Sequence, residues 1–300
     1  MITLSFISDL FTESFMQRAF FAGIMLGVLA PLIGSIVIIR RLSFIADTLG
    51  HFSLVGISLS LFLSYSLGNA MFADRPLLLG IVFSVVGGLL IEAFRRYYKS
   101  YKEISMPIVM SLGTAVSAIF FSLSKKTGSL YNYLFGSILT VTDYYIVWIA
   151  ATAIVVIALY FVFFRQIISV SFEESNAKFL GINLNFFQLV FIIVLSVVVS
   201  IMLEAAGVLL ISSMMIIPVA AAMKVGWSFR STTIISILFS ELSVFLGLWG
   251  AYSFNIPSGA AIVSVNILIL ILIAVVRRAR LAAVKKHSKQ DPITDSHQSM

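Results

Sequence analysis

The sequence predicts an all-helical, polytopic integral membrane protein. Of its 300 residues, 60% are hydrophobic and 11% are charged, whereas soluble domains average about 25% charged residues. Long apolar runs of membrane-spanning length alternate with short polar loops. The formal net charge of +7 comes from lysines and arginines gathered in those loops. The positive-inside rule explains this pattern better than a nucleic-acid partner does.

The chain divides into a short N-terminal tail (1–14), a membrane domain (15–276) and a basic C-terminal tail (277–300) that ends disordered. The N-terminus lacks the features of a cleaved signal peptide, so the first apolar run is interpreted as a retained span. The expected spans are residues 15–39, 48–67, 77–94, 105–123, 144–164, 186–203, 207–223, 231–252 and 260–276.

Nine spans place the basic loops at Arg40, Arg95, Arg165, Lys224 and Arg277 on one side of the membrane. The N-terminus is then outside and the C-terminus cytoplasmic. The short polar break before Gly207 decides this number. If residues 186–223 cross only once, eight spans remain and the N-terminus moves inside.

Two segments between spans have structure of their own. Residues 131–139 form an apolar piece too short to cross a bilayer, which predicts a re-entrant or interfacial helix on the outer side. The polar segment 165–185 contains an amphipathic stretch, 173–181, that predicts a short helix ended by Gly181.

Asp47 and His51 are the first candidate functional residues. They are four residues apart, hence on one face of a helix. Counted from Arg41, His51 lies roughly 15 Å into a ~30 Å hydrocarbon layer. Ionisable residues at that depth are usually functional, and carboxylate oxygen with imidazole nitrogen suits zinc and manganese. The alternative is a capping aspartate and a hydrogen-bonded buried histidine.

Three further features have a functional and a structural interpretation. Glu241 lies about ten residues into its span, near mid-membrane. It is either a ligand on the ion pathway or a protonated glutamate bonded to Ser240, Ser243 or the backbone. Glu204 lies near the outer boundary, where it either lines a gate or is structural. Two histidines, His287 and His297, lie in the tail, where scattered histidines are more often without function.

The sequence excludes several classes of function. It contains no cysteine, which removes disulfides and thiolate metal sites. It has no phosphate-binding loop of the G-x-x-x-x-G-K-S/T type, no H-E-x-x-H motif and no Ser/His/Asp nucleophile set. The chain is therefore not expected to be an enzyme, and any energy for transport must come from a partner or an ion gradient.

Residues 41–51, with the sequence RLSFIADTLGH, identify a family. This stretch resembles the metal-ion permeases of ABC importers, which move zinc, manganese or ferrous iron and show R-x-L/M-S-x-x-x-D-x-L-x-H here. Further matches follow in order at residues 55–59, 111–115, 134–139, 207–212 with 216–218, and 256–263. Two departures stand out. Gly50 replaces a serine or similar residue, which predicts a looser helix, and the F-D-P-E-type loop reads FEES at 172–175, without the proline.

The resemblance implies an ABC importer permease of the many-span type in a bacterial plasma membrane, a homodimer whose two copies line one pathway. A separate ATPase subunit would dock on residues 165–185, and an external metal-binding protein would deliver the ion to residues 124–142 and 255–259. Metal would be the substrate and no cofactor is tightly bound, with zinc favoured over manganese. The site residues this predicts are Asp47, His51 and Glu241 for metal, Glu173, Glu174, Ala177 and Gly181 for ATPase coupling, and Glu204 and Pro257 for the outer gate.

Two other transporter classes are alternatives to this interpretation. A proton-driven secondary metal transporter would use Asp47, His51 and Glu241 as a relay, but it predicts inverted repeats that the sequence does not show. A permease for an organic metal chelate would need a wide central cavity. The Asp47/His51 pair favours a bare ion.

Overall fold

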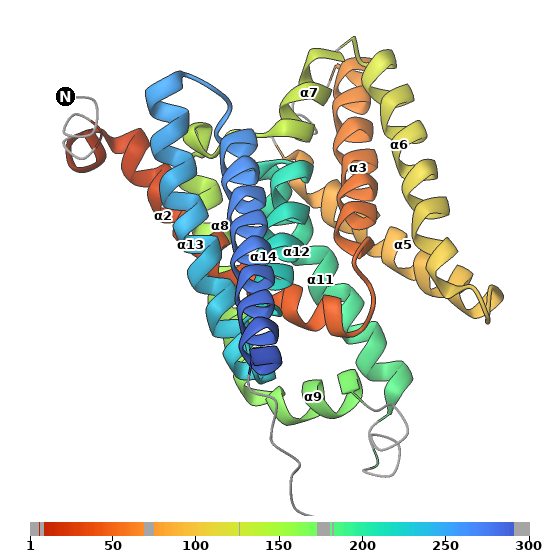
Figure 1. The fold of residues 1–300 in the computed structure, drawn as a ribbon. Coiled ribbons are helices and arrows are strands. Elements are labelled where there is room, and N and C mark those ends of the chain that lie inside the picture. The colour runs from red at the N-terminus through yellow and green to blue at the C-terminus, as the bar shows by residue number, and fades with distance from the viewer. Residues whose placement is uncertain are drawn as a thin grey trace, which may run out of the picture.

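The computed structural model describes residues 6, 9–68, 75–125, 127–172, 181 and 183–290, without the side chains of 127–129 and 281–290. The fold is a bundle of helices (Figure 1). The helices that cross or enter the membrane are α2 (Ser14–Ile39), α3 (Ile45–Leu67), α5 (Pro76–Tyr97), α6 (Ser105–Leu123), α8 (Asp143–Val162), α11 (Leu184–Ala206), α12 (Val208–Ala222), α13 (Phe229–Phe254) and α14 (Ser258–Gln290). Shorter helices are η1 (Lys102–Ile104), α7 (Thr127–Phe135), η2 (Ile138–Thr140) and α9 (Phe164–Phe172).

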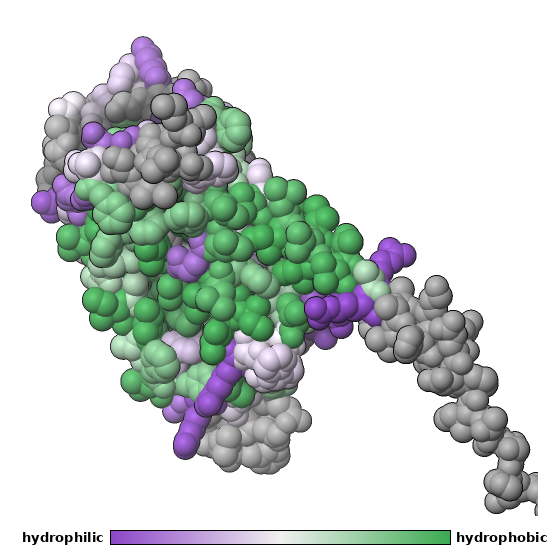
Figure 2. Space-filling view, turned by 60° about the vertical axis from the view of Figure 1, so that its left-hand side comes forward, coloured by the Kyte–Doolittle hydropathy of each residue, from purple (hydrophilic) through white to green (hydrophobic). Residues whose placement is uncertain are grey.

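The all-helical membrane architecture is confirmed. In the described part of the chain, 8 helices are long and apolar enough to span a bilayer, and α12 is a shorter apolar helix. Figure 2 shows a broad hydrophobic band across one face, with hydrophilic side chains gathered mostly toward its two ends. This distribution fits a hydrocarbon layer between two aqueous surfaces.

Close contacts at small residues show which way α3, α5 and α11 run. A Cβ on Gly56 of α3 would lie 2.1 Å from the Leu79 carbonyl oxygen of α5, and a Cβ on Gly87 would lie 2.5 Å from Cγ of Phe52. These pairs make α3 and α5 antiparallel. Ser196 of α11 donates to the Ser84 carbonyl (3.2 Å) while Gln188 donates to Glu92 (2.6 Å). Helix α11 is therefore antiparallel to α5 and parallel to α3.

Helix α12 returns in the opposite direction to α11. Ser212 contacts Asp47, whereas Val208 lies against Gly50, where a Cβ would be 3.2 Å from Cγ1 of Val208. Moving forward along α3 thus means moving backward along α12. The chain reverses at Gly207, which gives the hairpin on which the nine-span interpretation depends.

The shortness of α12 has a structural reason. Its 15 residues extend about 22 Å at 1.5 Å per residue, less than the ~30 Å hydrocarbon layer. Its first residue packs beside Gly50, close to the start of α3 at Ile45. The helix consequently begins inside the membrane, and the outer segment that follows α7 reaches inward to meet it.

Three helix boundaries differ from the sequence prediction. Helix α3 begins at Ile45 instead of at residue 48, and His51 lies roughly 9 Å beyond this helix start, whereas it lies roughly 15 Å from Arg41 by the count along the sequence. Helix α14 continues to Gln290 instead of ending at 276, because no glycine or proline interrupts residues 277–290. Residues 164–172, expected as the end of a span and a polar segment, form the separate helix α9, which crosses the end of the bundle opposite α7 (Figure 1).

Candidate metal transit site

Three contacts fix the start of α3, which carries Asp47 and His51. The Thr48 hydroxyl donates to the Phe44 carbonyl (2.8 Å) and to the Met106 carbonyl of α6 (3.3 Å). Ser84 of α5 donates to the Leu49 carbonyl (3.3 Å). Small hydroxyl side chains can satisfy backbone carbonyls across helices in a membrane. The turn between Asp47 and His51 is therefore held from two neighbouring helices.

Asp47 accepts a hydrogen bond from the Ser212 hydroxyl of α12. Ser212 also lies 3.2 Å from the Val208 carbonyl one turn earlier, which fixes its side chain. The Asp47 side chain is half-buried, so one part of its carboxylate is oriented and another part stays accessible. Such a bond orients a potential metal ligand. The sequence did not identify Ser212, because the two residues lie 165 positions apart.

His51 completes a pair with Asp47 on the same face of α3. Its ring is half-buried and its Nδ1 has no hydrogen-bond partner among the described residues. An imidazole with an unsatisfied nitrogen beside a carboxylate can bind a divalent cation. Within the described residues no group of three or more His, Cys, Asp or Glu side chains could hold one metal ion. Among the described residues, Asp47 and His51 are thus a pair of candidate ligands and not part of a larger cluster.

Gly50, which lies between Asp47 and His51 in the sequence, packs against Val208 of α12. It is buried inside α3, and its missing side chain lets Val208 approach. A larger residue here would require the Val208 side chain to shift by a few tenths of an ångström, one turn before Ser212 in α12. The glycine that departs from the family pattern therefore has a packing role.

Glu241 lies on a different interface from Asp47 and His51. Its carboxylate faces α2, where a Cβ on Gly27 would lie 2.6 Å from Oε1. This Oε1 is buried and has no hydrogen-bond partner in the described part of the chain. Asp47 instead faces α12. The structure joins two of the three predicted metal ligands and leaves the third apart.

Glu204 lies in the last turn of α11 and is bonded to two tyrosines. Tyr145 of α8 donates to its Oε1 at 2.8 Å, and Tyr133 of α7 lies 3.5 Å from the same oxygen. Burial, and next the neighbouring Glu204 charge, raise the pKa of Tyr133 above its ordinary value, so this phenol stays protonated and can donate. The carboxylate therefore ties α7 and α8 to the end of α11. Nothing in the sequence pattern marked the tyrosines as its partners.

The outer segment that contains Gly136 contacts both the α11–α12 reversal and the start of α14. A Cβ on Gly136 would lie 2.0 Å from the Ala206 carbonyl oxygen, and one on Gly207 would lie 2.6 Å from the Gly136 nitrogen. Ile138 donates its N–H to the Ser258 hydroxyl (3.0 Å), directly after the exposed Pro257. The predicted outer residues Glu204 and Pro257 thus adjoin one segment, 133–138.

The comparison with known proteins decides the family. The sequence model that describes the ABC 3 transport family matches residues 12–277 of this chain. The chain belongs to the ABC 3 transport family. It is a membrane permease subunit of an ABC transporter, and it is not itself catalytic. This agrees with the absence of a phosphate-binding loop from its sequence.

Several named relatives align with most of the chain. The manganese transport system membrane protein MntC of Listeria monocytogenes is 28% identical, over 89% of this chain and 92% of its own. The high-affinity zinc uptake protein ZnuB of Buchnera aphidicola is 31% identical, over 81% and 90%. The structure of PsaBC from Streptococcus pneumoniae with a Fab superposes with a TM-score of 0.78 at 28% identity, covering 90% of this chain and 95% of that one.

The predicted ATPase-coupling residues of this ABC 3 permease fall mostly outside the described residues. Glu173, Glu174 and Ala177 lie there. Gly181 is described, with φ of +76°, and a Cβ added to it would meet nothing within 4 Å among the described residues. The helix before this stretch, α9, ends with the exposed Phe172. Their coupling role remains a prediction.

Proposed function

We propose that this permease moves a divalent metal ion, manganese or zinc, into the cell through a transit site at Asp47 and His51. The observation that carries the proposal is the Asp47/His51 pair, oriented by Ser212 and left with an unpartnered imidazole nitrogen among the described residues. The names of the relatives support the same substrates, since MntC is named as a manganese transport protein and ZnuB as a zinc uptake protein. Membership of an ABC transporter family favours ATP as the energy source over a proton gradient.

A second copy of the chain would complete this metal site. Zinc takes four ligands in most protein sites, and one chain offers an aspartate and a histidine, while Glu241 faces elsewhere. Two copies around a two-fold axis would offer two carboxylates and two imidazoles. An incomplete or labile ligand set suits a permease, because the ion must also leave.

The partners follow from the transporter class. An ABC importer membrane subunit implies an ATPase and a binding protein. We place the ATPase at residues 165–185 by an amphipathic contact through Glu173, Glu174, Ala177 and Gly181. We place the binding protein over the outer segment next to Glu204 and Pro257. Closure of the ATPases would then alternate access to the transit site.

The order of preference between zinc and manganese is a separate prediction. The sequence favoured zinc, and both metals occur among the named relatives. The test is uptake of radioactive manganese in the presence of increasing zinc, and the reverse experiment, in cells that depend on this transporter. If zinc is preferred, manganese uptake should fall to half at a zinc concentration well below the manganese concentration in the assay. The opposite order would make manganese the preferred ion.

Replacing Ser212 with alanine should weaken metal uptake while the protein stays folded. The variant removes the hydroxyl that orients the Asp47 carboxylate, and loss of such an outer-shell partner typically costs about 10- to 100-fold in metal affinity. The measurement is the metal concentration for half-maximal uptake. Ser213→Ala is the matched control, because the Ser213 hydroxyl bonds only the Leu210 carbonyl of its own helix among the described contacts (2.8 Å). Equal half-maximal concentrations in the two variants would remove Ser212 from the site.

Tyr145→Phe should loosen the proposed outer gate. It removes the 2.8 Å bond to Glu204, and a hydrogen bond to a charged group contributes about 1.5–3 kcal/mol, or tenfold or more in an opening equilibrium. Because the chain has no cysteine, a single Ser137→Cys reports opening through labelling by a membrane-impermeant maleimide. Tyr145→Phe should raise the labelling rate about tenfold. The control Tyr144→Phe alters a neighbouring exposed tyrosine and should not, whereas equal rates in both variants would contradict the gate.

A further inference from the structure

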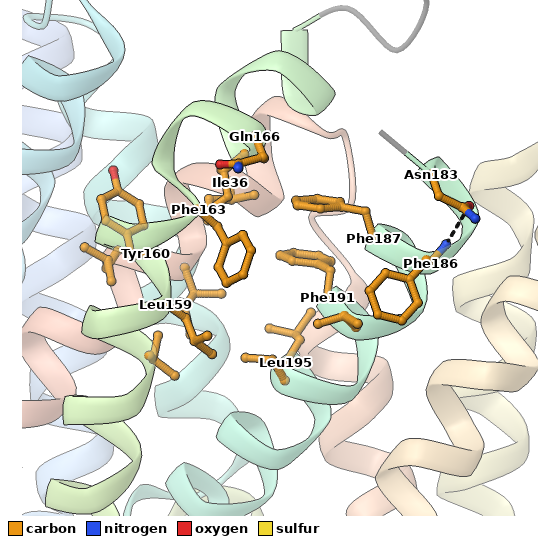
Figure 3. A pocket seen from close by; sticks show the side chains of 16 residues that line it. Ile36, Leu159, Tyr160, Phe163, Gln166, Asn183, Phe186, Phe187, Phe191 and Leu195 are labelled. Carbon is orange, nitrogen blue, oxygen red and sulfur yellow. Dashed lines mark hydrogen bonds between the residues drawn. The ribbon is translucent and has the colours of Figure 1, made fainter. Parts of the chain in front are cut away.

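An apolar groove opens between α2, α8 and α11 in the cytoplasmic half of the bundle. It has a volume of about 270 Å³ and is roofed by α9. Figure 3 shows Phe163, which directly follows α8, facing Phe187 and Phe191 of α11 across the groove, with Leu159 and Leu195 deeper inside. The groove also opens sideways to the surface, because Phe163 and Phe186 at its edges are 43% and 66% exposed. A hydrocarbon chain from the surrounding bilayer can therefore enter it.

Positive charge and an unsatisfied polar group lie at the cytoplasmic end of this groove. The Arg40 guanidinium carbon lies 5.0 Å from the ring centre of Phe191 and 6.0 Å from that of Phe187, so a cation stands over two of the lining rings. Gln166 lines the groove, and its buried Oε1 has no hydrogen-bond partner among the described residues. The amide of Asn183, which also lines the groove, is engaged, since its side-chain oxygen accepts from the Phe186 N–H at 3.2 Å.

Among the described residues, the charged side chains next to the groove and to α9 are arginines. No acidic side chain is among the described residues that line it. Arg165 precedes Gln166 in α9, and Arg230 lies 4.9 Å from the ring centre of Phe164 in the same helix. The nearest carboxylate on α5, Glu92, is engaged by Arg95, Arg96 and Gln188. Basic pockets between membrane helices on the cytoplasmic side are suited to anionic lipid head groups.

We infer that this groove is a binding site for one anionic phospholipid of the cytoplasmic leaflet. An acyl chain would fill the space between Phe163 and Phe191, the phosphate would lie beside Arg40, and a head-group hydroxyl would donate to the Gln166 Oε1. A phosphoglycerol head group carries a negative charge on its phosphate, which no cationic group neutralises, and hydroxyls on its glycerol, which makes phosphatidylglycerol the matching chemistry. A bound lipid would also join α8 to α11 next to the segment proposed to receive the ATPase.

Native mass spectrometry of the permease–ATPase complex tests this inference. The complex is released from nanodiscs made of equal parts phosphatidylglycerol and phosphatidylcholine, and the lipids retained per permease are counted. The unaltered complex should keep phosphatidylglycerol in several-fold excess over phosphatidylcholine. Val190→Trp fills the groove and should abolish the retention, whereas Leu189→Trp places the same bulk on the neighbouring position, which lines a different surface pocket, and should not.

Arg40→Gln gives an independent arm that does not depend on how a bulky side chain packs. It should reduce the excess of phosphatidylglycerol several-fold, while Arg41→Gln, at the adjacent exposed arginine, should leave the excess unchanged. Equal retention of the two lipids by the unaltered complex, or full retention in both Val190→Trp and Arg40→Gln, would overturn the inference. Efficient disulfide cross-linking between two Phe186→Cys permeases in the native membrane would overturn it too, because the groove would then be covered by a second copy.

Discussion

Replacing Asp47 or His51 with alanine should reduce metal uptake to background while the permease stays in the membrane. Each variant removes a direct ligand of the proposed transit site. Loss of an outer-shell partner already costs about 10- to 100-fold in metal affinity, so loss of a ligand should cost at least as much. Uptake of radioactive manganese and zinc, with the amount of permease in the membrane measured alongside, gives the result.

The controls for this experiment are an aspartate and a histidine outside the site. Asp143 pairs with Arg18 on the surface at 3.1 Å, with its side chain 82% exposed, and such pairs contribute little. His287 lies near the end of α14. Asp143→Ala and His287→Ala should both transport normally. Uptake at the unaltered rate in Asp47→Ala and His51→Ala would exclude these residues as the transit site.

Replacing Gly207 with alanine should destabilise the protein and stop transport together. Gly207 has φ of +78° and ψ of 159°. This conformation is almost restricted to glycine, and it costs any other residue about 1–3 kcal/mol. Its new methyl group would also lie 2.6 Å from the Gly136 nitrogen. Since Gly207 fixes the start of α12, the Ser212 contact with Asp47 should be lost as well. We expect the melting temperature to fall by roughly 5 °C.

Gly250→Ala is the matched change in a position without these constraints. A Cβ on Gly250 meets nothing within 4 Å among the described residues, and the glycine lies inside α13, where alanine is favoured over glycine by about 1 kcal/mol. Its melting temperature should stay the same or rise slightly. The tryptophan fluorescence of the purified protein follows both unfolding transitions. A Gly207→Ala protein as stable and as active as Gly250→Ala would show that the reversal tolerates a side chain.

Much of this fold could be predicted because the bilayer restricts what a sequence can do. Apolar runs of about 20 residues have to form helices. The arginines and lysines in the loops between them indicate which loops face the cytoplasm. The reversal at Gly207 was also visible, as a short break between two apolar runs. The end of α14 was not, because the prediction ended the helix where the charges begin, whereas only a helix-breaking residue would end it.

The contacts that build the candidate site could not be predicted in the same way. The i, i+4 spacing of Asp47 and His51 is local, so the sequence revealed it. The Ser212 hydroxyl reaches Asp47 from another helix, and the Glu204 carboxylate meets Tyr133 and Tyr145 from two more. These pairings depend on how helices pack, which a single sequence does not encode in any spacing. The same holds for Glu241, whose mid-span position predicted a shared site and whose packing against α2 separates it.

The most direct test of the central claim is pulsed electron paramagnetic resonance of Mn²⁺ bound to the purified permease–ATPase complex. A site shared by two copies through Asp47 and His51 predicts one bound ion per two permease chains, with magnetic coupling to imidazole nitrogen that disappears in His51→Ala. One ion per chain, or nitrogen coupling of full strength in His51→Ala, would contradict it.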